Sequence, residues 1–241
     1  MCTVTYIPQS PDSFVLSSNR DENPARSPRN LTRLETGGNA MVFPRDTAAG
    51  GSWIIAENNN RVVCVLNGAF EKHHHQPPYK KSRGIMALEF FRFPRAGVFA
   101  SEYDFEGIEP FTMVIVEKGE LFELRWDENQ AHFRELDPRG FHIWSSATLY
   151  PEPVREKRKG WFQNWLANRG DFGLEAIHAL HRNGGEGDHM NDYVMNRGIV
   201  QTVSITHVVK KAGSLEFIYH DLLREATKTE SILLKGSPRK A

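Results

Sequence analysis

Two apolar runs in the N-terminal half constrain the fold of this chain most strongly. Residues 53–56, Trp-Ile-Ile-Ala, and residues 62–66, Val-Val-Cys-Val-Leu, flank the Asn-rich segment 57–61. Two apolar runs of this kind around a short polar turn predict a β-hairpin. Because both runs are almost continuously apolar, the two strands are expected to be covered on both faces.

Further hairpins, separated by helices, are predicted along the rest of the chain. The strand pairs are residues 4–7 with 14–17, 111–117 with 120–126, and 200–209 with 214–219, and two short strands lie at 132–135 and 141–145. Apolar residues recur at helical spacing in the segments 82–91, 154–168 and 174–182. This order favours an α+β protein in which two antiparallel sheets pack together with helices outside.

The remaining segments are polar. Residues 19–50 are rich in Pro, Gly and Asn and are predicted to form a long loop or a lid. No internal repeat or linker divides residues 1–225, which are expected to form a single domain. Residues 226–241 are expected to be a polar C-terminal tail.

Composition argues against several classes of partner. The 241 residues include 30 basic and 30 acidic side chains, so charge gives no reason to expect nucleic acid or an anionic membrane. The two cysteines, Cys2 and Cys64, are too few for a disulfide framework and fit a reducing compartment. No apolar run approaches the roughly 20 residues of a membrane span, and the start lacks the features of a secretory signal. We therefore expect a cytoplasmic protein.

Cys2 directly follows the initiator methionine. Because cysteine is a small residue, removal of Met1 is expected, and Cys2 would then be the first residue. A terminal cysteine carries a thiol and a free α-amine, whose ordinary pKa values are about 8.5 and about 7.7–8.0. Such an amine can act as the base for its own nucleophile without a histidine. The simpler interpretation is a small residue at the start of a strand.

Four short motifs occur in a recognisable order: Met1-Cys2-Thr3, the segment Ser18-Asn19-Arg20-Asp21-Glu22-Asn23-Pro24, Gly50-Gly51-Ser52-Trp53, and Ser82-Arg83-Gly84. In this order they resemble the NRDE family, which is named after its Asn-Arg-Asp-Glu tetrad and is also known from the transport and Golgi organisation protein 2. The resemblance covers residues 1–220. The tetrad behind a Met-Cys start is its specific part, and the other pieces add weight only through their order.

The resemblance implies the four-layer αββα sandwich of N-terminal nucleophile hydrolases. The cysteine enzymes that look most similar, of the choloylglycine hydrolase and penicillin V acylase type, cleave non-peptide amide bonds. Carried over by motif, this implies an amidohydrolase that acts on a small amide through a thioester, without a metal or another cofactor. The alternative is a non-catalytic trafficking protein that binds a lipid or haem-like ligand in the same cleft, because the family is also associated with lipid and haem handling.

The resemblance also implies roles for individual residues. Cys2 would be the nucleophile, Arg20 would lower the pKa of its thiol, Asp21 would anchor the α-amine, and Asn67 would stabilise the oxyanion. The substrate would contact Asn19, Glu22, Trp53 and Ser146. From the residues alone, Arg20-Asp21 could equally be a solvated turn pair, and Asn67-Gly68 could be a turn signal.

The chain departs from the family pattern at two positions. Ser146 lies where relatives often carry the asparagine of a Ser-Asn-Ala segment. Val203 lies where relatives tend to carry the arginine of a Thr-Arg-Ser segment. Each change removes a polar group that could have assisted the site.

Other cysteine and histidine residues have simpler structural interpretations. Cys64 lies in an apolar run and is expected to be a buried, unreactive thiol. The segment His73-His74-His75 is interpreted as a solvated loop, since three adjacent histidines cannot all face one ion from a regular strand or helix. His178, His181 and His189 are likewise not assigned to a metal site.

Overall fold

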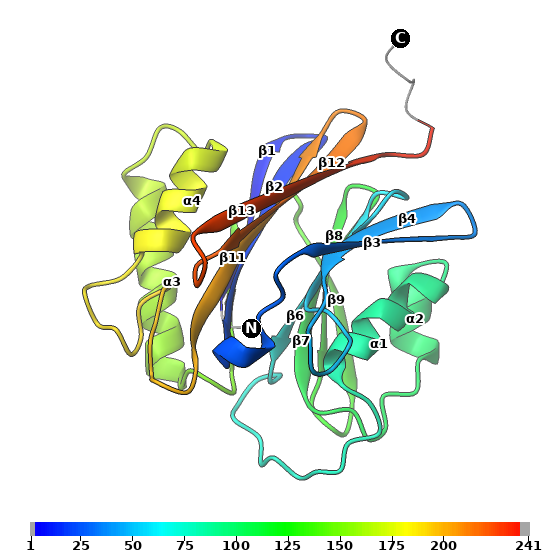
Figure 1. The fold of residues 1–241 in the computed structure, drawn as a ribbon, viewed down its shortest axis with the longest axis horizontal. Coiled ribbons are helices and arrows are strands. Elements are labelled where there is room, and N and C mark those ends of the chain that lie inside the picture. Colours follow the sequence, from blue (N-terminus) through cyan, green and yellow to red (C-terminus); the bar gives the residue numbers. More distant parts are fainter. Residues whose placement is uncertain (1–2, 237–241) are drawn as a thin grey trace.

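Two antiparallel sheets pack face to face in the computed structural model, which describes residues 3–236 (Figure 1). Helices α3 (Glu152–Ala167) and α4 (Leu174–Asn183) cover the outer face of one sheet. Helices α1 (Arg83–Glu89) and α2 (Ala96–Glu102) cover the outer face of the other. The predicted αββα arrangement is confirmed.

The first sheet joins the beginning and the end of the chain. Its six strands, in spatial order, are β10 (His142–Ser145), β1 (Thr3–Ser10), β2 (Ser13–Glu22), β11 (Gln201–Lys211), β12 (Ser214–Asp221) and β13 (Ala226–Leu233). The predicted hairpins correspond to β1–β2 and β11–β12. The β2–β11 pairing, in which Ile205 lies opposite Asn19, makes residues near the two ends of the chain neighbours.

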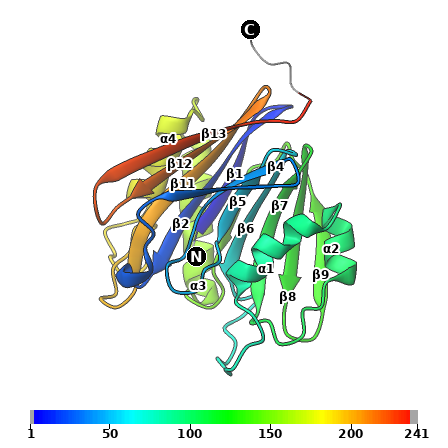
Figure 2. The same ribbon diagram turned by 45° about the vertical axis from the view of Figure 1, so that its right-hand side comes forward.

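The second sheet is a meander in which each strand pairs with the next one along the chain (Figure 2). Its seven strands are β3 (Leu31–Thr36), β4 (Asn39–Pro44), β5 (Ile54–Glu57), β6 (Arg61–Asn67), β7 (Phe111–Glu117), β8 (Glu120–Trp126) and β9 (Ala131–Leu136). The predicted hairpins β5–β6 and β7–β8 are confirmed.

The apolar run in β6 is buried on both faces, as predicted. Val62 and Cys64 belong to the core between the two sheets, whereas Val63 and Val65 belong to the core beneath α1 and α2. Complete burial of an aliphatic side chain stabilises a fold by about 1.5–3 kcal/mol. The run therefore holds three of the four layers together.

The prediction of a loop over residues 19–50 is wrong for much of this segment. Strand β2 continues through the tetrad to Glu22, and residues 31–44 form the β3–β4 hairpin. Strand β3 lies at a sheet edge with residues 33–36 exposed, so it needs few apolar side chains. The buried polar residues at the end of β2 are stabilised by hydrogen bonds rather than by apolar contacts.

The prediction of a polar tail from residue 226 is wrong for residues 226–233. These residues form β13, an edge strand of the six-stranded sheet, in which only Ile232 is buried. The sequence patterns also missed helix α2, which contributes Phe99 to the core. Among residues 3–236, no helix combines the length and apolar character of a membrane span.

Candidate functional site

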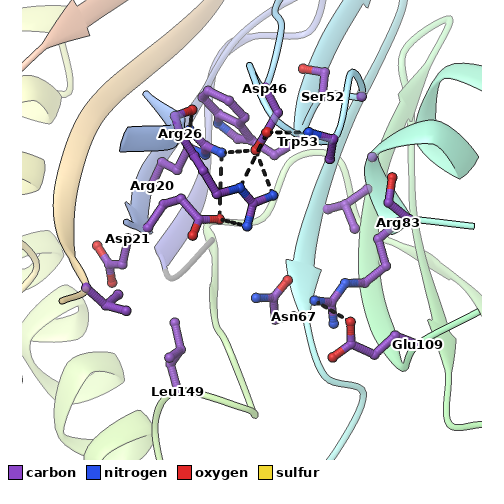
Figure 3. Close-up of a pocket in the computed structure, with 17 residues that line it drawn as sticks. Arg20, Asp21, Arg26, Asp46, Ser52, Trp53, Asn67, Arg83, Glu109 and Leu149 are labelled. Atoms are coloured by element: carbon purple, nitrogen blue, oxygen red, sulfur yellow. Dashed lines mark hydrogen bonds and ion pairs between the residues drawn. The ribbon is translucent and has the colours of Figure 1, made fainter. Parts of the chain in front are cut away.

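A cavity of about 310 Å³ opens where the carboxyl ends of β2 and β6 face each other (Figure 3). Strand β2 contributes Arg20, Asp21 and Glu22, and strand β6 contributes Asn67. The two strands belong to different sheets, so the sandwich itself brings these residues together. Of the predicted site residues that the structure describes, these four and Trp53 line the cavity.

The Arg20 guanidinium is buried in one wall of the cavity. It pairs with the Asp46 carboxylate, donates to the Arg26 carbonyl at 3.0 Å and stacks over the Trp53 ring at 4.0 Å. Burial lowers the pKa of Arg20, although the carboxylates of Asp46 and Glu22 oppose this effect. Arg20 is therefore a positioned, charge-compensated group rather than a solvated turn residue.

Asp46, which sequence patterns did not single out, organises this wall. Its Oδ1 accepts hydrogen bonds from the backbone amides of Ala48 and Ala49, both at 2.9 Å, while Oδ2 pairs with Arg20 and Arg26. Burial alone would raise the pKa of Asp46. The Ala49 amide and the two guanidinium groups outweigh burial, so the pKa lies below its ordinary value.

The Asp21 carboxylate lies at the other side of the β2 end and is 3 % exposed. Tyr150 donates its hydroxyl to one carboxylate oxygen at 2.7 Å, and Thr202 donates to the other at 2.6 Å. Within residues 3–236, no lysine, arginine or histidine forms an ion pair with Asp21. The two hydroxyl donors fix the carboxylate and leave its negative charge without a cationic partner in this part of the chain.

Asn67 ends β6 with its side chain in the cavity (Figure 3). Its carbonyl accepts a hydrogen bond from the Ser146 hydroxyl at 2.8 Å. Ser146 is fully buried and does not line the cavity. Its contact therefore supports the backbone of Asn67 rather than a substrate.

Two motif pieces that looked weak in the sequence meet at the far wall. The backbones of Gly51 and Gly84 are so close that a Cβ on Gly51 would lie 2.4 Å from the Gly84 carbonyl carbon. The Ser52 amide also donates to the Gly84 carbonyl at 3.2 Å. This approach fixes the first turn of α1, whose Arg83 lines the cavity.

Arg83 is paired with Glu109 at 2.9 Å and donates to the Pro110 carbonyl at 3.0 Å. Burial lowers the pKa of Arg83, and Glu109 opposes this effect. Burial alone would raise the pKa of Glu109. The Arg83 charge and the contact with His73 lower this pKa by more than burial raises it, so the net shift is downward. His73 is 3.0 Å from Glu109 with a side chain only 9 % exposed, so the interpretation of residues 73–75 as a solvated loop is wrong for this histidine.

Asn19, like Ser146, is a predicted site residue that lies away from the cavity. Asn19 is fully buried and donates to the carbonyls of His181, at 3.0 Å, and Tyr193, at 2.7 Å, so it joins β2 to α4 and the following loop. Cys64 is a free buried thiol whose pKa burial raises to about 12, which agrees with the expectation of an unreactive residue. Cys2 lies outside the described residues, as do residues 237–241 of the predicted tail.

Four charged residues of the cavity were not among the predicted site residues: Arg26, Asp46, Arg83 and Glu109. Arg83 belongs to the Ser-Arg-Gly piece of the resemblance, which was a signal for its position but not for its role. Asp46 and Glu109 carried no signal, because their partners are distant in the chain.

Comparison with known proteins agrees with this architecture. A family model described as Transport and Golgi organisation 2 matches residues 1–213. No curated protein matches the chain. A cysteine-to-alanine mutant of conjugated bile acid hydrolase from Clostridium perfringens has a TM-score of 0.55 at 10 % identity, covering 99 % of this chain and 94 % of that one. An arginine-to-leucine variant of the same enzyme gives 0.52 at 10 %, covering 96 % and 92 %. At this identity the likeness shows a shared fold, that of the N-terminal nucleophile hydrolases.

Proposed function

Since the chain belongs to the transport and Golgi organisation 2 family, we propose that it is an N-terminal cysteine amidohydrolase that cleaves a small non-peptide amide through a thioester. The observation that carries this proposal is the meeting of Arg20, Asp21 and Asn67 around one cavity. Strand β1 begins beside them, because Thr3 pairs with Asn19, the residue directly before Arg20. The proposed nucleophile, Cys2, is covalently attached to Thr3.

The acylation step uses groups from a single residue and one oxyanion donor. After removal of Met1, the α-amine of Cys2 takes the thiol proton, and the sulfur attacks the amide carbonyl carbon. The Asn67 side-chain amide donates to the oxygen that becomes negative. The ammonium group then protonates the leaving nitrogen, the carbon–nitrogen bond breaks, and a thioester remains on Cys2.

Deacylation reverses these proton transfers. The neutral α-amine takes a proton from water, and the resulting hydroxide attacks the thioester carbon. The carbon–sulfur bond breaks, the thiolate regains its proton from the ammonium group, and a carboxylic acid leaves. The products are one acid and one amine, with no redox change.

Asp21 is suited to hold the α-ammonium group. It is a buried carboxylate fixed by two hydroxyl donors, and buried carboxylates are normally stabilised by a cation or by hydrogen bonds. Arg20 is suited to favour the thiolate, although its pairing with Asp46 reduces the charge that it presents to the cavity.

The cavity lining favours a small polar amide over a lipid or haem. Pockets for apolar ligands are lined mainly by hydrophobic and aromatic side chains. Here the lining includes a set of charged residues: Arg20, Asp21, Glu22, Arg26, Asp46, Arg83 and Glu109. The enzyme with the same fold is named for hydrolysis of a conjugated bile acid, which supports a hydrolytic reaction.

Release of p-nitroaniline from a panel of short-chain acyl p-nitroanilides tests the proposal. The full chain is expected to hydrolyse at least one member, Cys2→Ala is expected to be inactive, and Cys64→Ala is the matched control that keeps activity. Activity that survives in Cys2→Ala would overturn the mechanism. Titration with haem, followed by absorbance, tests the alternative, and saturable binding in the cavity would favour it.

A further inference from the structure

Three histidines converge on the face of the six-stranded sheet that α4 covers. His178 comes from α4, His207 from β11 and His220 from β12, and one ring nitrogen of each lies within 4.8 Å of the others. On β11 and β12, Val209 and Ile218 lie two residues from His207 and His220, so each faces the same side of the sheet as its histidine. Both pack in the core beneath α3 and α4. The cluster is therefore on the opposite face of this sheet from the core between the two sheets, and none of the three histidines lines the cavity.

Hydroxyl groups fix the orientation of two of these rings. Ser17 Oγ is 2.7 Å from His207 Nδ1, and Thr227 Oγ1 is 2.9 Å from His220 Nδ1. When each Nδ1–H donates to its hydroxyl, the lone pair is on Nε2. The Nε2 of His207 then accepts a hydrogen bond from His178 Nδ1 at 3.0 Å, which a bound ion would replace. Histidine ligands of metals are typically held in this way, through a hydrogen bond from the nitrogen that does not bind the metal.

We propose that His178, His207 and His220 form a binding site for a divalent transition-metal ion of the zinc type. Imidazole nitrogen suits Zn²⁺, Cu²⁺ and Ni²⁺. Zinc binds imidazole at about 2.0–2.1 Å, so neighbouring ligand nitrogens in a tetrahedral site lie about 3.4 Å apart. His178 Nδ1 and His207 Nε2 are 3.0 Å apart, and all three ligand atoms lie within 4.8 Å of one another, so the wider pairs would close on the ion.

The ionisation of the cluster fits this role. Burial lowers the pKa of His178, His207 and His220, so all three rings are neutral near pH 7, and neutral imidazole is the form that binds metal. Three protein ligands leave a fourth position for water or another ligand. The ion would join α4 to two strands of the sheet.

The sequence around His178 does not predict a metal site, because the usual short-range ligand spacing is absent. The three ligands are separated by 29 and 13 residues along the chain, and only the packing of α4 on β11 and β12 brings them together.

Arg182 is an exposed cation next to the cluster. Its charge lowers the pKa of His178 and His220, and it would oppose a bound cation in the same way.

Isothermal titration of the chelator-treated full chain with ZnCl₂ tests the proposal. One Zn²⁺ is expected to bind per chain and to raise the melting temperature, because a ligand that binds only the folded state stabilises it. Ser17→Ala is expected to weaken binding by about 10–100-fold through loss of the contact that orients His207. His220→Gln is expected to weaken binding further, whereas Arg182→Ala is expected to strengthen it.

The matched control is the double variant His74→Ala, His75→Ala, which removes exposed histidines outside the cluster and is expected to bind as the unmodified chain does. His178→Gln and His220→Gln, at the two half-buried positions, decide the matter, with folding checked by circular dichroism, and the fully buried His207 is left unchanged. Unchanged zinc affinity in both glutamine variants, or loss of binding in the control, would overturn the proposal.

Discussion

At the scale of single residues, the cavity holds its charges in two different ways. Arg20 and Arg83 are compensated by Asp46 and Glu109, whereas Asp21 is held only by neutral hydroxyl groups within the described part of the chain. A buried carboxylate is costly to a fold unless hydrogen bonds and a cationic partner compensate for its desolvation. In the proposed mechanism Asp21 binds the α-ammonium of the catalytic residue.

Replacement of Asn67 separates catalysis from stability. Asn67→Ala removes the proposed oxyanion donor, and loss of one such donor typically costs about 10²–10³-fold in kcat. The half-buried side chain makes a small contribution to packing, so the unfolding transition is expected to change little. Steady-state kinetics and urea unfolding measure the two effects. Asn129→Ala, an exposed asparagine elsewhere, is the control, and equal activity of both variants would remove Asn67 from the mechanism.

Asp46 predicts a specific dependence of stability on pH. Its folded-state pKa is lowered, so it stabilises the fold above its unfolded pKa of about 3.9, and this contribution disappears as the pH falls through the folded value. Asp46→Asn is expected to destabilise the protein at pH 7 by less than the cost of a fully unpaired buried charge, about 3–5 kcal/mol, because Glu22 remains 3.7 Å from the Arg20 guanidinium. The difference from the unmodified chain should shrink below pH 4, as measured by urea unfolding across pH. A difference that is constant with pH would contradict this account.

At the scale of elements, two glycines set the distance between the β4–β5 loop and α1. A Cβ on Gly51 would collide with the Gly84 backbone, which cannot move as a side chain can. Gly51→Ala is therefore expected to destabilise the protein by about 1–3 kcal/mol and to reduce amide hydrolysis by displacing Arg83. Thermal unfolding and the p-nitroanilide assay report these effects.

Gly160 provides the matched control for that prediction. It lies within α3, and a Cβ there would have no heavy atom within 4 Å. Alanine is favoured over glycine in a helix by about 0.5–1 kcal/mol, so Gly160→Ala is expected to stabilise the protein without a change in activity. Destabilisation by Gly160→Ala, or no effect of Gly51→Ala, would show that the close backbone approach is not the cause.

Sequence patterns predicted most interior strands and the edge strands β9 and β10, but they missed the interior strand β4 and the edge strands β3 and β13. Strands β5, β6 and β7 are buried throughout or nearly so, and their apolar runs predicted them directly. Strands β3 and β13 lie at sheet edges, where most side chains face solvent and no apolar pattern is required. Their positions follow from pairing with a neighbouring strand, which a local window of sequence does not contain.

At the scale of the whole molecule, distant segments build the cavity and its supports. Asp21 near the start is held by Thr202 from β11 and by Tyr150 from the middle of the chain. The family resemblance indicated Arg20, Asp21 and Asn67, but not Asp46 or Glu109. Partners that are brought together only by tertiary packing leave no spacing in the sequence to detect.

Arg158 links three such segments beneath the start of β1. This fully buried guanidinium in α3 donates to Thr3 Oγ1 and to the carbonyls of Asn191, at 2.9 Å, and Asp192, at 2.5 Å. Lysine keeps the charge but cannot reproduce this planar set of donors. Arg158→Lys is expected to leave at least one buried carbonyl unpaired, at a cost of about 1–3 kcal/mol. Urea unfolding measures this cost, and an unchanged midpoint would contradict it.

The rate at which iodoacetamide alkylates Cys2 at pH 6 tests directly whether Cys2 is an activated nucleophile; intact mass gives the rate and peptide mapping locates the label. The purified chain is expected to lack Met1, and Cys2 is expected to react at least about threefold faster than the synthetic peptide Cys-Thr-Val-Thr-Tyr. A pKa lower by about one unit gives about ten times more thiolate, partly offset by lower nucleophilicity. Cys64, buried in the core, should remain unmodified. Retention of Met1, or a rate no faster than that of the peptide, would contradict an N-terminal cysteine nucleophile.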